Sequence, residues 1–106
     1  MKILITGANS QITQAVESHF ENHEVITTTS TKATSSTVNF NLSNAAVDVS
    51  NLPKHIDVLI LNAATYTPPR RKLHEMQLDK ISQTINADLV GNLILLHHYL
   101  PQMIEK

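Results

Sequence analysis

The 106-residue sequence contains no cysteine, which excludes disulfide bonds, thiolate nucleophiles and cysteine-ligated zinc. The apolar run near the N-terminus covers only residues 3–5, which is too short for a signal peptide or a membrane span. A formal net charge of -1 provides no basic field for nucleic acid. From these absences we expect one cytoplasmic domain spanning residues 1–106, with neither nucleic acid nor a membrane as partner.

The sequence does contain an alternation of short apolar or β-branched runs with segments of helical periodicity. Strands are predicted at residues 2–5, 23–29, 37–40 and 57–62, and helices at residues 10–22, 43–51 and 78–100. Ser43 is expected to cap the second helix, and Pro101 to end the third unless residues 102–106 resume it. Short connections between alternating strands and helices predict an α/β fold with a parallel sheet.

Glycine is also scarce, with two in the whole chain, and one of them lies in the turn after the first strand. The segment TGANSQIT, residues 6–13, has the layout of a phosphate-binding loop between a strand and a helix. In dinucleotide loops one glycine makes the tight turn, a second lets the backbone approach the pyrophosphate, and a third lets helix and strand pack closely. Gly7 fills the first position, whereas Gln11 and Thr13 occupy the other two.

Some phosphate-binding chemistry remains in this turn. Asn9 and Ser10 offer side-chain hydrogen bonds, and the helix that follows presents unpaired N–H groups and the positive end of its dipole. The alternative is an ordinary turn, in which Gly7 adopts a positive φ and Asn9 or Ser10 caps the helix. A Walker loop is excluded because no Lys-Ser or Lys-Thr pair follows.

Three patterns, taken in order, resemble the short-chain dehydrogenase/reductase family. TGANSQIT is similar to the family's TGxxxGxG turn, and LNAA at residues 61–64 stands where its fourth strand ends in NNAG. The long helix carries Asn86, Gly91 and a Pro-x-Met ending at residues 101–103, as the family's helix does. The resemblance implies the N-terminal half of such a protein: a three-layer Rossmann-like parallel sheet of about four strands in the order 3-2-1-4, with flanking helices.

The same resemblance implies that a nicotinamide dinucleotide binds at the carboxyl ends of the strands. The residues it assigns to the cofactor are Gly7, Asn9, Ser10, Gln11, Ile12, Ser30, Thr31, Asn41, Leu42, Asn62, Ala63 and Ala64. NADP is favoured over NAD, because Ser30 and Thr31 stand where an acid would bind the ribose 2′-hydroxyl of NAD. The alternatives are a solvated Ser/Thr loop, turn and packing residues at the strand ends, and a loop that has lost the cofactor.

Asn86 is the one catalytic-type residue that the resemblance assigns, since the family's asparagine helps to hold a proton-relay water. Its alternative role is that of a buried polar residue which satisfies a backbone group. The family's catalytic Ser and YxxxK motif are missing: Arg70 lies four positions after Tyr66, and Met103 four after Tyr99. We therefore expect an oxidoreductase-family domain that is inactive alone, or alternatively a non-catalytic nucleotide-binding or oligomeric interaction module, or a structural relic without a ligand.

The six histidines do not predict a metal site. His97 and His98 are adjacent on a helix and diverge by roughly 100°, so both cannot face one ion without a ligand from elsewhere. No HExxH or GxSxG motif is present, so neither a zinc protease nor a serine hydrolase is indicated.

Two apolar surfaces are expected to remain uncovered. The strand at residues 57–62 has no proline or lysine to protect it at a sheet edge. In the long helix one apolar stripe is assigned to the sheet: Leu78, Ile81, Ile85, Leu89, Leu93, Leu96 and Leu100. A second stripe is left over: Val90, Ile94, Leu95 and Tyr99. We expect a homo-oligomer through residues 57–64 and 78–100, unless the natural protein is longer and covers them itself.

Overall fold

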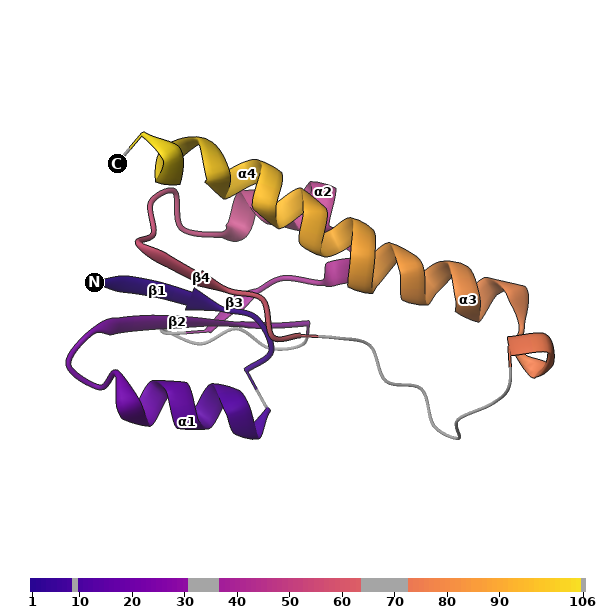
Figure 1. Ribbon diagram of the computed structural model, residues 1–106, viewed down its shortest axis with the longest axis horizontal. Coiled ribbons are helices and arrows are strands. Elements are labelled where there is room, and N and C mark those ends of the chain that lie inside the picture. The colour runs from indigo at the N-terminus through magenta and orange to yellow at the C-terminus, as the bar shows by residue number, and fades with distance from the viewer. Residues whose placement is uncertain (9, 31–36, 64–72, 106) are drawn as a thin grey trace.

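The computed structural model describes residues 1–8, 10–30, 37–63 and 73–105, and it confirms the α/β fold (Figure 1). Four strands form one parallel sheet in the order β3-β2-β1-β4, as predicted. The strands are β1 (Lys2–Ile5), β2 (Glu24–Thr29), β3 (Thr37–Asn39) and β4 (Val58–Ile60). In the central register Leu4 pairs with Ile26 on one side and with Leu59 on the other.

Helices cover both faces of the sheet. Helix α1 (Gln11–His19) lies on one face, and α2 (Ala45–Asp48) and α4 (Asn92–Ile104) lie on the other (Figure 1). Helix α3 (Leu78–Ile85) continues through the π-helical η4 (Asn86–Gly91) into α4, and this rod extends beyond the sheet. Three short 3₁₀ helices complete the described elements: η1 (Leu42–Asn44), η2 (Val49–Asn51) and η3 (Leu73–Glu75). Within the described ranges, no helix has the length and apolar character that a membrane span requires.

The hydrophobic core lies mainly between the sheet and α4. Leu4 and Ile26 contact Leu95 and Tyr99 there, and all four side chains are buried. Because successive strand side chains alternate between faces, Ile3 and Ile5 face the α1 side, where they are also buried. The edge strand β4 is less well covered, since each of its three residues is only partly buried.

The rod turns a different face to the sheet from the one that the sequence predicted. Leu95 and Tyr99, assigned to the left-over stripe, are fully buried in the core, and Ile94 packs against it. Five residues assigned to the sheet are exposed instead, from 43 % for Leu100 to 82 % for Leu78; the others are Ile85, Leu89 and Leu93. Both stripes are apolar, so hydrophobicity alone does not choose between them.

Two features of the rod fix its rotation. The π-helical turn at Asn86–Gly91 breaks the 3.6-residue period that the sequence argument carried through the whole helix. Gly91 then lies so close to Leu42 that a Cβ atom on it would come within 2.5 Å of the Leu42 carbonyl oxygen. Only the face that contains Gly91 can approach this backbone.

The second helix begins and runs differently from expectation, and at Pro101 the stated alternative of a continuing helix is the one observed. The side chain of Asn41, and not that of Ser43, caps the segment after β3, because Asn41 Oδ1 accepts a hydrogen bond from the Ser43 N–H at 2.9 Å. Residues 42–51 then form three short helical pieces instead of one helix. At the other end Pro101 lies inside α4, which continues to Ile104.

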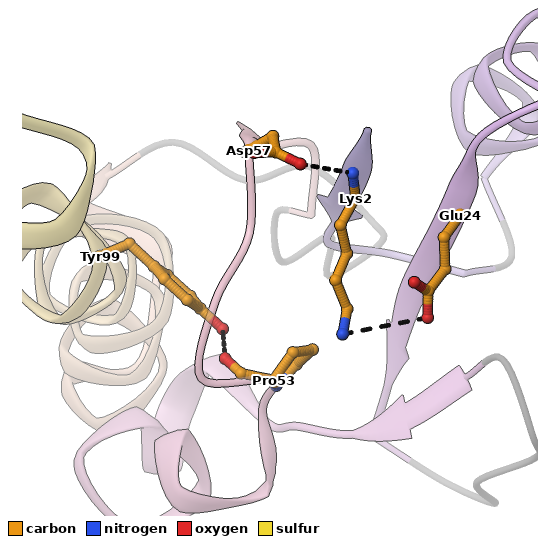
Figure 2. A network of polar contacts seen from close by, with 5 residues as sticks. All are labelled: Lys2, Glu24, Pro53, Asp57 and Tyr99. Atoms are coloured by element: carbon orange, nitrogen blue, oxygen red, sulfur yellow. Dashed lines mark hydrogen bonds and ion pairs between the residues drawn. The ribbon is translucent and has the colours of Figure 1, made fainter. Parts of the chain in front are cut away.

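Hydrogen bonds on either side of Pro101 hold α4 against the chain before β4. The Tyr99 hydroxyl donates to the Pro53 carbonyl at 2.6 Å (Figure 2). Gln102 bonds to the same turn twice: its Nε2 donates to the Lys54 carbonyl at 2.7 Å, and its Oε1 accepts from the Ile56 N–H at 3.1 Å. These tertiary bonds hold α4 in place on both sides of the proline, which lacks the N–H that a helix-interior residue donates.

We expect Tyr99→Phe to lower the free energy of unfolding by about 1–2 kcal/mol, because the Pro53 carbonyl loses its donor. Burial raises the pKa of Tyr99 from 10.0 to about 12. The native state therefore holds this proton longer than the unfolded chain does, and the wild type loses stability as the pH rises through that interval. Tyr99→Phe has no such proton to lose, so the difference in free energy of unfolding between wild type and variant becomes smaller as the pH rises.

Urea denaturation at about pH 8 and about pH 11 measures both effects. Ser50→Ala is the control, since it removes only the exposed hydrogen bond from Ser50 Oγ to the Val47 carbonyl. If the difference in free energy of unfolding between wild type and Tyr99→Phe stays constant with pH, the raised pKa of Tyr99 is contradicted.

Candidate functional site

The candidate site lies where β1, β2 and β4 end and α1 begins. Gly7 has a φ of +91°, in the left-handed region that a tight turn at this point requires. A Cβ atom at this position would lie 3.3 Å from Asn62 Nδ2 and 3.4 Å from the Ala63 Cα. The turn therefore approaches the end of β4 closely, and a larger residue at position 7 would be strained.

The end of β2 holds this turn from the other side. The Gly7 N–H donates to Thr28 Oγ1 at 3.2 Å, and the Ala8 N–H donates to the Thr28 carbonyl at 2.8 Å. Thr28 is buried. Both amides are consequently occupied inside the protein.

A network of three polar side chains fixes the start of α1. Ser10 Oγ caps the helix by accepting from the Thr13 N–H at 3.0 Å, and it also accepts from Asn62 Nδ2 at 2.7 Å. Thr13 Oγ1 donates to the Gly7 carbonyl and lies 3.2 Å from Asn62 Nδ2 and 2.9 Å from Ser10 Oγ. Since the Thr13 proton goes to Gly7, the Ser10 hydroxyl must donate to Thr13. Ser10 therefore has no hydrogen-bonding capacity left for a ligand.

Thr6 joins the ends of β1 and β4. Its N–H donates to the Ile60 carbonyl at 3.1 Å. Its buried hydroxyl oxygen accepts from the N–H groups of Asn62 and Ala63, at 3.0 and 2.9 Å. This hydroxyl satisfies two backbone donors just beyond the last ladder bond of β4.

Two backbone amides at the start of α1 remain available. In the described part of the chain, no group accepts a hydrogen bond from the N–H of Gln11 or of Ile12. Both side chains are exposed, and the N–H groups lie at the positive end of the α1 dipole. This arrangement fits a phosphate group. Gln11 does not block it, because an exposed, flexible side chain can move aside, and Thr13 is turned inward into the network.

The other residues assigned to the cofactor are more dispersed. Ser30 is exposed at the end of β2, and Asn41 uses its side-chain oxygen to cap η1. Leu42 packs against the core, beneath Gly91. Their contacts with a cofactor remain predictions. Three further assigned residues lie outside the described part of the chain: Asn9, Thr31 and Ala64.

Asn86 stands at the first residue of η4. Its Nδ2 donates to the Ser43 carbonyl at 2.8 Å, so its side chain joins the rod to the segment after β3. An open cavity of about 680 Å³ lies beside it, lined among the described residues by Asp79, Ser82, Gln83, Ile85, Asn86 and Val90. Asn86 is exposed and not buried as its alternative role required, although its bond to Ser43 does satisfy a backbone carbonyl. Its hold on a water molecule is still a prediction.

Thr6 and Thr28 were not identified from the sequence as residues of the site. Thr13 was recorded only as a larger residue at a position where dinucleotide loops have glycine. A side chain at position 13 was visible, but its hydrogen-bond partner Asn62 is 49 residues away in the chain. Asn62 Nδ2 donates both of its protons within the network. The assignment of Asn62 to the cofactor stays a prediction.

No family model matches the sequence, and no curated protein matches it either. Solved structures do match. A short-chain dehydrogenase from Pseudomonas syringae superposes with a TM-score of 0.77 at 20 % identity, over 99 % of this chain and 53 % of that one. The ligand-free aldohexose dehydrogenase of Thermoplasma acidophilum gives a TM-score of 0.74 at 21 % identity, over 99 % of this chain and 45 % of that one.

A third match is 4-hydroxyisoleucine dehydrogenase complexed with NADH, with a TM-score of 0.73 at 25 % identity, over 98 % of this chain and 50 % of that one. The chain thus spans about half the length of these proteins. It has the Rossmann-like fold of short-chain dehydrogenases, as its motifs predicted, and the match over about half of their length is consistent with an N-terminal half.

Proposed function

We propose that residues 1–106 are a single nucleotide-binding domain of a short-chain dehydrogenase/reductase-like oxidoreductase, and that its ligand is a nicotinamide dinucleotide. The observation that carries the proposal is the pair of available N–H groups on Gln11 and Ile12, beside a glycine with positive φ. The cofactor's phosphate binds there. The NADH complex of a structural neighbour supports a dinucleotide as the ligand class.

Within this proposal NADP is favoured over NAD. An acid that binds the ribose 2′-hydroxyl of NAD normally follows the second strand. Here no Asp or Glu occurs between Glu24 and Asp48, and the exposed Ser30 directly follows the last residue of β2. A hydroxyl group and the nearby Lys32 in the sequence suit a 2′-phosphate.

Hydride transfer would be the chemistry of the bound nicotinamide, and carbonyl reduction needs a proton donor beside it. Tyr99 is unsuited to that role, because its hydroxyl is buried, donates to Pro53, and has a pKa raised to about 12 by burial. The sequence lacks a YxxxK motif. We therefore propose that these residues bind the cofactor without catalysis. Separately, the absence of cysteine favours the cytoplasm as the location that we propose.

Calorimetric titration with NADPH and NADH tests the proposal. We expect saturable binding, with NADPH the tighter ligand. Gly7→Ala is expected to weaken binding by about tenfold, because the added Cβ is strained at positive φ and presses on Asn62. Ser50→Ala serves as the control and should bind as the wild type does. Absence of binding to either dinucleotide at about 1 mM, a typical upper bound for specific sites, would refute the function.

A second role, self-association, is favoured by the exposed apolar stripe of the rod. Leu78, Ile85, Leu89 and Leu93 are each more than half exposed. The edge strand β4 adds partly buried Val58 and Ile60. An uncovered apolar surface of this length is typical of a protein interface. We propose that the chain forms homo-oligomers through residues 57–64 and 78–100.

Sedimentation velocity at tens of micromolar concentration tests this role, because a dimer with a Kd of about 1 µM would be largely associated there. We expect a dimer or a larger species, and a monomer for the double variant Leu89→Glu, Leu93→Glu. Val47→Glu is the control, because Val47 is more exposed than Leu89 or Leu93 but lies on α2, outside the proposed interface. A wild-type protein that sediments as a monomer would rule out this role.

A further inference from the structure

Thr13 occupies the position at which dinucleotide loops carry their third glycine, and its side chain is fully buried. The glycine of such loops allows close packing of helix on strand. Here a hydroxyl takes the place of that packing and bonds to the end of β4 through Asn62. The helix and strand are therefore joined by directional bonds, which specify one relative placement.

We infer that Thr13 and Asn62 are positioning residues for the phosphate end of the nucleotide site, an inference that rests on the function proposed above. Neither side chain is offered as a contact with the ligand. Thr13 is completely buried, and Asn62 Nδ2 already donates to Ser10 and Thr13. Their effect is to set where the N–H groups of Gln11 and Ile12 lie.

The segment from Ser10 to Thr13 connects Asn62 to the two available N–H groups. Gln11 and Ile12 lie between Ser10 and Thr13 in the first turn of α1, and both ends of that segment are bonded to the Asn62 amide. Ser10 Oγ also accepts from the Thr13 N–H, which closes the turn. The two available N–H groups are thus held at fixed positions relative to the end of β4.

The network has one arrangement of protons. Asn62 donates to both hydroxyls, Ser10 donates to Thr13, and Thr13 donates to the Gly7 carbonyl. Removing the Thr13 hydroxyl leaves one Asn62 N–H and the Ser10 hydroxyl proton without an acceptor, and the Gly7 carbonyl keeps only the long bond from the Ser10 N–H, at 3.4 Å. These groups must find new partners, and the first turn of α1 moves with them.

Three variants separate positioning from stability. Thr13→Val keeps the shape of the side chain and removes the hydroxyl, Thr13→Ser keeps the hydroxyl, and Thr84→Val makes the same substitution in α3, where Thr84 Oγ1 donates to the Lys80 carbonyl. All are compared below the onset of unfolding, so that a loss of stability alone does not change the measured affinity. The readouts are calorimetry with NADPH and the NMR signals of the Gln11 and Ile12 amides during titration with inorganic pyrophosphate.

We expect pyrophosphate to shift both amide signals in the wild type. Thr13→Val should weaken NADPH binding by about tenfold or more and reduce those shifts, while Thr13→Ser and Thr84→Val behave as the wild type does. Unchanged NADPH affinity in folded Thr13→Val would overturn the positioning role and leave the proposed function intact. Failure of the wild type to bind either NADPH or pyrophosphate would overturn both.

Discussion

The hydrogen bonds that end β4 are the interaction on which the site depends. Parallel strands present their last N–H groups at one edge, where the ladder stops and buried donors would otherwise lack partners. The Thr6 hydroxyl accepts from the N–H groups of Asn62 and Ala63, the second and third residues after β4, and the Asn62 side chain bonds to Ser10 at the start of α1. The end of β4, the turn after β1 and the start of α1 are thereby joined by side-chain hydrogen bonds.

A different constraint orders the opposite face of the sheet. There the rod of α3, η4 and α4 packs through Leu95 and Tyr99, and Gly91 permits close approach to the Leu42 backbone. The bond from Tyr99 to Pro53 holds the C-terminal half of α4 beside the chain that enters β4 (Figure 2). Two bonds from Gln102, to Lys54 and Ile56, act in the same way. The start of β4 is thus fixed from the α4 face, and its end from the α1 turn.

The sheet was predictable from the sequence because its strands are short, apolar or β-branched runs that alternate with helices. The buried face of the rod was not, since Leu89 and Leu95 are equally hydrophobic and the π-helical turn leaves no signal in composition. The cap at Asn41 was missed for a related reason: Asn41 and Ser43 are both good capping residues, and the fold decides between them.

The site was predictable only in outline. Gly7 and the helix after it follow from the TGANSQIT segment, whereas the role of Thr13 depends on Asn62, which lies 49 residues further along the chain. A motif compares residue types at fixed positions, so it registers Thr13 as a departure from glycine. The hydroxyl that compensates for this departure becomes visible only when the partners are placed in space.

Amide hydrogen exchange, followed residue by residue with NMR, tests the central claim most directly. The account predicts strong protection for the amides of Asn62 and Ala63, which donate to the buried Thr6 hydroxyl, and rapid exchange for those of Gln11 and Ile12. Exchange at Asn62 and Ala63 as fast as at Gln11 and Ile12 would contradict it.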